Sequence, residues 1–162
     1  MLALRYASLL ALSIWVGGLV ALGAIAAPAI FEVIGARGVG DGRMLSGAVF
    51  GEVLRRFHLL SYGCGALVLA TLTARAILGP RPRRFAIRTG IAIVMLAVAL
   101  YSGIVVSGRI ETLRTEIGVA PSSLPETDPR RAEFGRLHRW STALQIVPLA
   151  GGLLLMLWEL RD

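Results

Sequence analysis

Four long stretches of the chain contain no charged residue, and the charged residues are gathered between them. These stretches are residues 6–31, 57–74, 89–108 and 140–158. Each comes close to the roughly 20 apolar residues that a helix needs to cross a hydrocarbon core of about 30 Å. The second stretch is the shortest, but Arg75 can extend its guanidinium to the headgroups while the helix continues to Leu78. The pattern therefore predicts a membrane protein whose spans are about 6–31, 57–78, 88–108 and 138–158.

The connections between the spans alternate between long and short. Residues 79–82, Gly-Pro-Arg-Pro, form a short link that stops a helix, because each proline removes a backbone donor. The longer connections continue the apolar periodicity of the second and third spans beyond the membrane, and Asp128-Pro129 supplies an N-cap and a first-turn proline for a helix entering the fourth span. We expect an all-α membrane protein, an up-down bundle of four transmembrane helices made of two hairpins. Spans two, three and four extend beyond the membrane on one side, and residues 1–162 form one transmembrane domain.

Composition supports a membrane protein and narrows its source. Of the 162 residues, 56% are hydrophobic, and all 17 basic residues are arginine, as is typical of a GC-rich bacterial genome. The formal net charge is +7. Because the arginines flank spans, anionic lipid headgroups are the nearer partner, and we expect no nucleic-acid binding. The partner expected from the pattern is the lipid bilayer. The pattern leaves open whether the chain also forms a homo-oligomer.

Charge asymmetry indicates the orientation in the membrane. Both termini and the link at residues 79–82 share one side of the bundle. Its arginines are Arg5, Arg75, Arg81, Arg83, Arg84, Arg88 and Arg161, and its acids are Glu159 and Asp162. Since the positive-inside effect is strongest for short loops, we expect both termini to be cytoplasmic in a bacterial inner membrane.

Small residues repeat every fourth position in two spans. In span one they are Ser13, Gly17 and Ala21, and in span three they are Ala99, Gly103 and Ser107. Small side chains allow helix backbones to approach closely in lipid, where the hydrophobic effect between helices is largely absent. We therefore predict that both stripes lie at helix–helix interfaces.

Two histidines begin two of the spans. Span four carries an inward stripe at heptad-like spacing that consists of His138, Ser141, Gln145, Pro148 and Gly152. Span two begins with His58, Ser61 and Gly65 at matching offsets. Since both spans run in the same direction, the two imidazoles are expected at similar depth, on the outer half of the membrane, where they can share one ligand.

Three hypotheses account for the histidine pair. In the first, each histidine forms interhelical hydrogen bonds and specifies packing in a structural or accessory protein. In the second, the imidazoles are axial ligands of a haem. The arginines near that level, candidates for binding its propionates, are Arg55, Arg56, Arg136 and Arg139. In the third, they bind a copper-type ion with Cys64 as a soft ligand.

The sequence contains no catalytic signature. There is no Ser-His-Asp grouping, glycine-rich phosphate loop or HExxH motif, and no acid within a predicted span to serve as a coupling-ion site. We therefore expect no catalytic residue and favour a non-enzymatic protein. Transport of, or resistance to, a small solute or metal remains a further alternative.

Three motifs carry a resemblance to a known family. They are Trp15-Val16-Gly17-Gly18, residues 27–31 (Ala-Pro-Ala-Ile-Phe) and residues 134–141 (Phe-Gly-Arg-Leu-His-Arg-Trp-Ser). In these motifs the chain resembles a bacterial membrane family of unknown function related to eukaryotic transmembrane protein 205, and more loosely the membrane domains of copper-resistance protein D. The eukaryotic relatives have Asn where this chain has Gln145. The resemblance implies a four-span membrane protein and no established reaction, although the eukaryotic member is associated with resistance to platinum drugs.

Overall fold

The structure, a computed structural model, describes residues 1–36 and 42–161, which form helices and no strand. The first long helix consists of α1 (Leu2–Ala21), the π-helical segment η1 (Leu22–Ala26) and α2 (Ala27–Ala36). The second is α3 (Gly42–Leu78). The third consists of α4 (Phe85–Leu100), the π-helical segment η2 (Tyr101–Val106) and α5 (Ser107–Ile117). After a short 3-10 turn, η3 (Pro121–Ser123), the fourth consists of α6 (Pro129–Leu144) and α7 (Ile146–Arg161).

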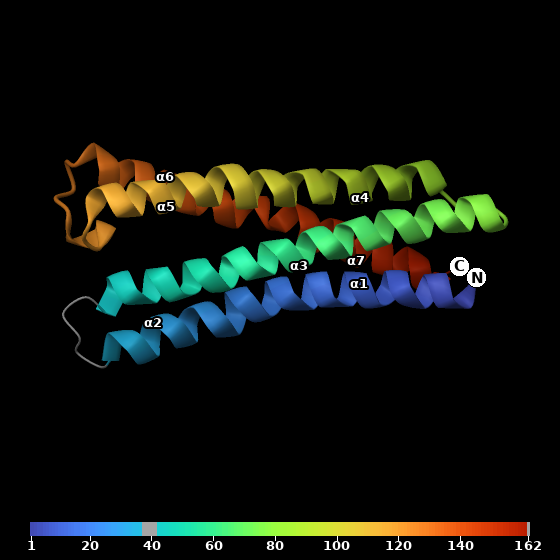
Figure 1. Ribbon diagram of the computed structural model, residues 1–162, viewed down its shortest axis with the longest axis horizontal. Helices are drawn as coiled ribbons and strands as arrows, with labels where there is room; N and C mark the ends of the chain where they lie inside the picture. The colour runs from blue at the N-terminus through green and yellow to red at the C-terminus, as the bar shows by residue number, and fades with distance from the viewer. Residues whose placement is uncertain (37–41, 162) are drawn as a thin grey trace.

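The predicted four-helix bundle of two hairpins is confirmed (Figure 1). Both termini and the short α3–α4 connection lie at one end of the bundle, which we call the terminal end. The longer connections lie at the opposite end, the loop end. All four long helices, of 33, 37, 33 and 33 residues, are apolar and long enough to cross a membrane. The first therefore extends beyond membrane length as well, whereas the sequence pattern predicted an extension of only the other three.

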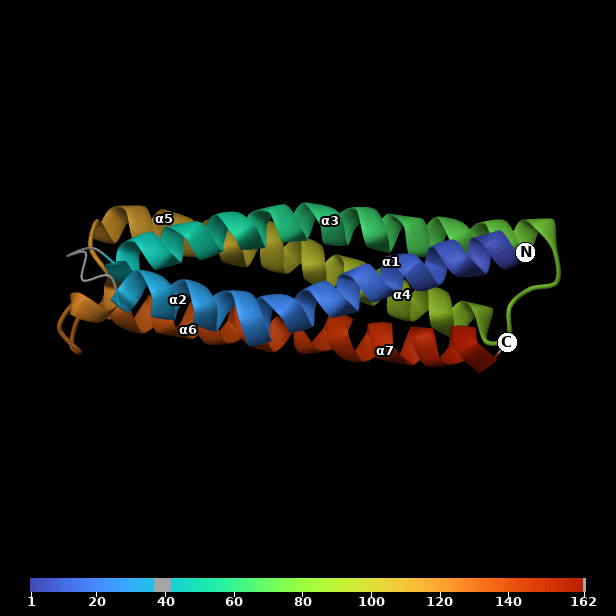
Figure 2. The ribbon, with the colours of Figure 1, turned by 90° about the horizontal axis from the view of Figure 1, so that it is seen from below.

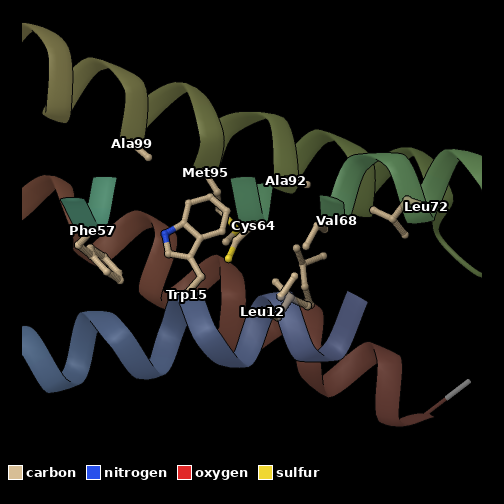
Figure 3. Packing of buried hydrophobic residues seen from close by; sticks show 11 residues of the cluster. Leu12, Trp15, Phe57, Cys64, Val68, Leu72, Ala92, Met95 and Ala99 are labelled. Atoms are coloured by element: carbon tan, nitrogen blue, oxygen red, sulfur yellow. The ribbon is translucent and has the colours of Figure 1, made fainter. Parts of the chain in front are cut away.

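The hydrophobic core lies in the terminal half of the bundle. Trp15 is fully buried at its centre, between Leu12 of α1, Cys64 of α3 and Met95 of α4 (Figure 3). Gly65 permits this packing, because a Cβ there would lie 3.1 Å from the Trp15 ring and 2.9 Å from Leu96. Here α1 contacts α3 and α7, and α4 contacts the same two helices, so each helix has two close neighbours.

Three of the four long helices have an irregular turn near the middle of the bundle. The π segment η1 comes just before Pro28, whose backbone nitrogen has no hydrogen to donate to the carbonyl four residues earlier. In the fourth long helix the regular pattern breaks at Gln145, three residues before Pro148, for the same reason. Gln145 Nε2 donates a hydrogen bond to Ser102 Oγ in η2 at 3.3 Å. The break in one helix is thus joined to the π segment of its neighbour.

The predicted start of the fourth long helix is confirmed. The Asp128 carboxylate accepts a hydrogen bond from the backbone N–H of Arg130 at 2.8 Å, and Pro129 occupies the first helical position. The side chain and backbone N–H of Arg130 both donate to Asp128 and hold the pKa of this carboxyl group below its ordinary value. This cap fixes where the loop between α5 and α6 ends.

Candidate functional site

A cavity of about 2210 Å³ lies in the loop half of the bundle. There the α2–α3 pair and the α5–α6 pair lie apart (Figure 1), although each pair is in contact internally. The cavity is lined by residues from all four long helices, both apolar and charged. It begins at the level of the irregular turns, with Leu22 and Gly23 in η1 and Gly103 in η2. The irregular turns therefore mark the level at which close packing gives way to open space.

His58 lies at the inner end of this cavity. Its side chain is only 4% exposed, and its Nε2 atom is buried with no hydrogen-bond partner. Gly103 of η2 lies against it, since a Cβ at that position would be 2.9 Å from His58 Cγ and would overlap the Tyr62 hydroxyl. The His58 and Tyr62 rings stack with centroids 6.1 Å apart. His58 is thus held between its own helix and the third long helix, with one nitrogen unsatisfied.

His138 of α6 lines the same cavity but is exposed. Its ring stacks on Phe134, one turn earlier, with centroids 6.4 Å apart and planes inclined by 4°. The main neighbours of α6 are α5, α7 and η2, whereas those of α3 are α1, α2 and α4. The two histidines therefore face one cavity from helices that are not closely packed against each other.

The other predicted ligand residues separate into two groups. Ser141 and Gln145 line the cavity with the histidines. Ser61 does not, and its buried hydroxyl donates to the Phe57 carbonyl at 2.9 Å. Cys64 is 6% exposed within the hydrophobic core. Among the described residues no three His, Cys, Asp or Glu side chains gather as a metal-binding group, so the predicted combination of Cys64 with both histidines is not formed.

The four predicted arginines also differ in position. Arg55 and Arg139 line the cavity. Arg56 lines a separate apolar groove between α1 and α3, and Arg136 is exposed and lines neither. Arg55 and Arg56 both donate to the Glu52 carboxylate, at 2.7 and 2.8 Å. Among the described residues no acid forms an ion pair with Arg139, which leaves its charge available to an anion in the cavity.

A buried ionic cluster, which we name the Glu159 cluster, lies at the terminal end. The Glu159 side chain is 2% exposed and accepts hydrogen bonds from Arg75 at 2.7 Å and from Arg88 at 3.4 Å. Arg5 donates to the Glu159 backbone carbonyl at 2.6 Å. One acid thus joins arginines from α1, α3 and α4 to α7. The charge pattern predicts that these residues lie on the same side of the membrane, but it does not predict that they pair.

Two members of the Glu159 cluster lie on continuations of the two histidine stripes. Continued at the same spacing of three and four, the stripe from His58 passes through Gly65 and Leu72 to Arg75. The stripe from His138 likewise passes through Gln145 and Gly152 to Glu159. Both Arg75 and Glu159 are buried, and each stripe therefore runs from a histidine in the cavity half to one partner of an ion pair.

The two small-residue stripes have different surroundings. In the third long helix Ala99 is buried and Gly103 lies against α3. In the first long helix the stripe is exposed, and a Cβ at Gly17 would meet nothing within 4 Å. The exposed residues are Ser13, Gly17 and Ala21. Gly18 instead makes the close approach, because its hydrogen faces the Phe57 ring. Ser107 of the other stripe is partly buried beside the cavity.

One comparison with known proteins identifies a match. A family model described as a domain of unknown function, DUF4149, matches residues 10–118. The matched segment includes His58, the first long helix from residue 10 onwards and the second and third long helices, and it ends before α6, so that His138 and Glu159 lie beyond it. Neither a curated protein nor a solved structure matches the chain.

Proposed function

The chain belongs to the family of the domain of unknown function DUF4149, and from that premise we propose that it is a ligand-binding membrane protein. The single observation that carries the proposal is that both histidines of the chain line one cavity between its two hairpins. At about 2210 Å³ this cavity exceeds the 300–1,000 Å³ typical of sites for small molecules. It is therefore large enough for a cofactor that is bulkier than a single ion.

Haem is the ligand that these residues support best. His58 has a buried nitrogen without a partner, and an iron bond would satisfy such a nitrogen. Arg139, and Arg55 through the part of its guanidinium not bonded to Glu52, are the cations that would hold propionates. Both imidazoles would have to lie close together to hold one metal atom, since metal–nitrogen bonds are near 2 Å. Ligation by both histidines would thus draw α6 towards α3.

The localisation belongs to the same proposal. We infer a bacterial inner membrane with both termini in the cytoplasm, which puts the cavity on the outer side. The support is the excess of arginine at the terminal end and the lysine-free, arginine-rich composition. The motif likeness to eukaryotic transmembrane protein 205 supports a shared ancestry of the two groups.

Visible absorption and elemental analysis of the purified protein test the proposal. The parent protein, expressed with added haem, should show a Soret band and contain iron, and His58→Ala and His138→Ala should each change the band and weaken haem retention. Phe134→Leu is the matched control, because it removes the ring that stacks on His138 without removing a ligand atom. Its spectrum should match that of the parent.

Each other outcome decides against haem. Copper bound without a Soret band, and in a smaller amount in both histidine variants, would mean that the ligand is a metal ion rather than haem. A colourless, metal-free protein after expression with haem or copper would leave the histidines as packing residues. In that case the variants should change only stability, through the packing of the two rings against Tyr62 and Phe134.

A further inference from the structure

Four exposed arginines gather at the terminal end of the bundle. Arg81, Arg83 and Arg84 lie in the short α3–α4 connection, and Arg161 ends α7. The connection and the C-terminus lie at the same end in both views (Figure 2). We name these four residues the arginine end, and we propose that they bind the phosphate headgroups of anionic phospholipids.

The arginine end forms no ion pair with an acid among the described residues. The one described acid at this end, Glu159, is buried and already bonded to Arg5, Arg75 and Arg88. Asp162 lies outside the described residues. At the loop end, by contrast, most of the described arginines have an acidic partner. These pairs are Arg55 and Arg56 with Glu52, Arg109 with Glu133, Arg114 with Glu111, Arg130 with Asp128 and Arg131 with Glu126. The loop end thus balances most of its arginines with acids, whereas all four residues of the arginine end present their charge to an external anion.

An apolar collar directly adjoins these arginines. Leu2, Ile77, Leu78 and Leu160 are 81%, 76%, 71% and 71% exposed and lie within a few residues of the helix ends there. A nucleic acid or a soluble acidic protein would match the cationic groups but not the apolar surface beside them. A phospholipid matches both parts, because its phosphate lies at the level of the arginines and its acyl chains contact the apolar residues.

Arg84 joins this surface to the folded bundle. It is the one non-glycine residue with a left-handed backbone among the described residues, with φ of 56°. Its guanidinium lies 5.4 Å from the centre of the Trp158 ring, a geometry that favours cation–π attraction. Trp158 also contacts Arg88 and lies next to Glu159 in α7. The arginine end is thus built on the Glu159 cluster, which fixes its position at the headgroup level, where tryptophans are commonly found.

Quenching of Trp158 by brominated lipids tests the proposal with the full chain. Trp140→Phe removes the exposed indole of α6, and Trp15 is buried in the core. In nanodiscs that contain a small fraction of brominated lipid, brominated phosphatidylglycerol should quench more than brominated phosphatidylcholine. Arg81→Gln with Arg83→Gln should weaken the preference by roughly fivefold for each arginine removed, the effect expected of about 1 kcal/mol. The matched control, Arg109→Gln with Arg130→Gln, removes the same charge from the loop end and should retain it.

Two results would overturn the proposal. Equal quenching by the two lipids in the parent protein would overturn the proposal. So would a preference that persists unchanged in the Arg81→Gln, Arg83→Gln variant, because the anionic lipid would then bind elsewhere. A third measurement needs no substitution. High salt screens an electrostatic contact and should therefore reduce the preference of the unmodified protein for phosphatidylglycerol.

Discussion

At the residue scale, adjacent glycines in this chain have opposite surroundings. Gly17 faces open space, whereas Gly18 faces the Phe57 ring and Gly103 faces His58. Gly17 and Gly103 nevertheless belong to stripes of small residues with the same spacing. The difference is the side of the helix on which each glycine lies relative to the neighbouring helices. This depends on the rotation of the helix about its own axis.

We predict that Gly103→Leu destabilises the protein and that Gly17→Leu does not. A leucine at position 103 would have to displace Tyr62 and the His58 ring, and overpacking of this kind costs about 1–3 kcal/mol. Thermal unfolding in detergent measures both variants against the parent. Similar losses of stability would mean that Gly17 contacts another copy of the chain.

The Glu159 cluster gives a second prediction at this scale. Glu159→Gln removes the carboxylate that Arg75 and Arg88 share, and breaking a buried ion pair costs about 3–5 kcal/mol. Glu116→Gln is the control, because its pair with Arg109 is exposed and worth about 0–1 kcal/mol. Denaturant unfolding in detergent should show a large loss only for Glu159→Gln, and equal effects would contradict the structural role of the cluster.

At the element scale, each long helix has a closely packed half and a half that borders the cavity. The change occurs at η1, at η2 and at Gln145, where the regular hydrogen-bond pattern is interrupted. Such interruptions permit a helix to change direction. Across the cavity, Arg114 of α5 donates to the Gly47 carbonyl of α3 at 2.7 Å, and Gly51 leaves room for its guanidinium. This contact joins the two hairpins near the loop end.

Arg114→Ala should therefore let the hairpins separate further. Spin labels at Leu45 of α3 and Thr115 of α5, in a Cys64→Ala background, would report a longer and broader distance distribution by pulsed electron resonance. Arg109→Ala is the matched control, since Arg109 bonds Glu133 and so joins α5 to α6 within one hairpin. A distribution unchanged by Arg114→Ala would show that other contacts hold the loop end together.

At the scale of the whole molecule, the two ends of the bundle have different chemistry. The terminal end combines a buried ionic cluster with exposed arginines, and the loop end combines a cavity with locally paired charges. A membrane protein with this asymmetry has a preferred orientation, because unpaired arginines in short loops stay in the cytoplasm.

We predict that Arg83 lies in the cytoplasm and Ser122 outside it. Cysteines introduced singly at these exposed positions, again in a Cys64→Ala background, should differ in labelling of intact cells by an impermeant thiol reagent. Position 122 should be labelled and position 83 protected until the cells are opened. Labelling of position 83 alone would show that the orientation is the opposite of the predicted one.

The sequence by itself determined the four helices, their order and the start of α6, because span length, prolines and caps are local properties of the chain. It also places His58 and His138 each on one stripe of its helix, since heptad spacing defines one face of a helix whatever surrounds it. Only the tertiary structure decided that Gly18 rather than Gly17 approaches α3, because helix rotation depends on the neighbours. Packing likewise brought Glu159 to Arg75, 84 positions away, and separated the hairpins around a cavity. Each of these features depends on contacts between helices, which no local pattern records.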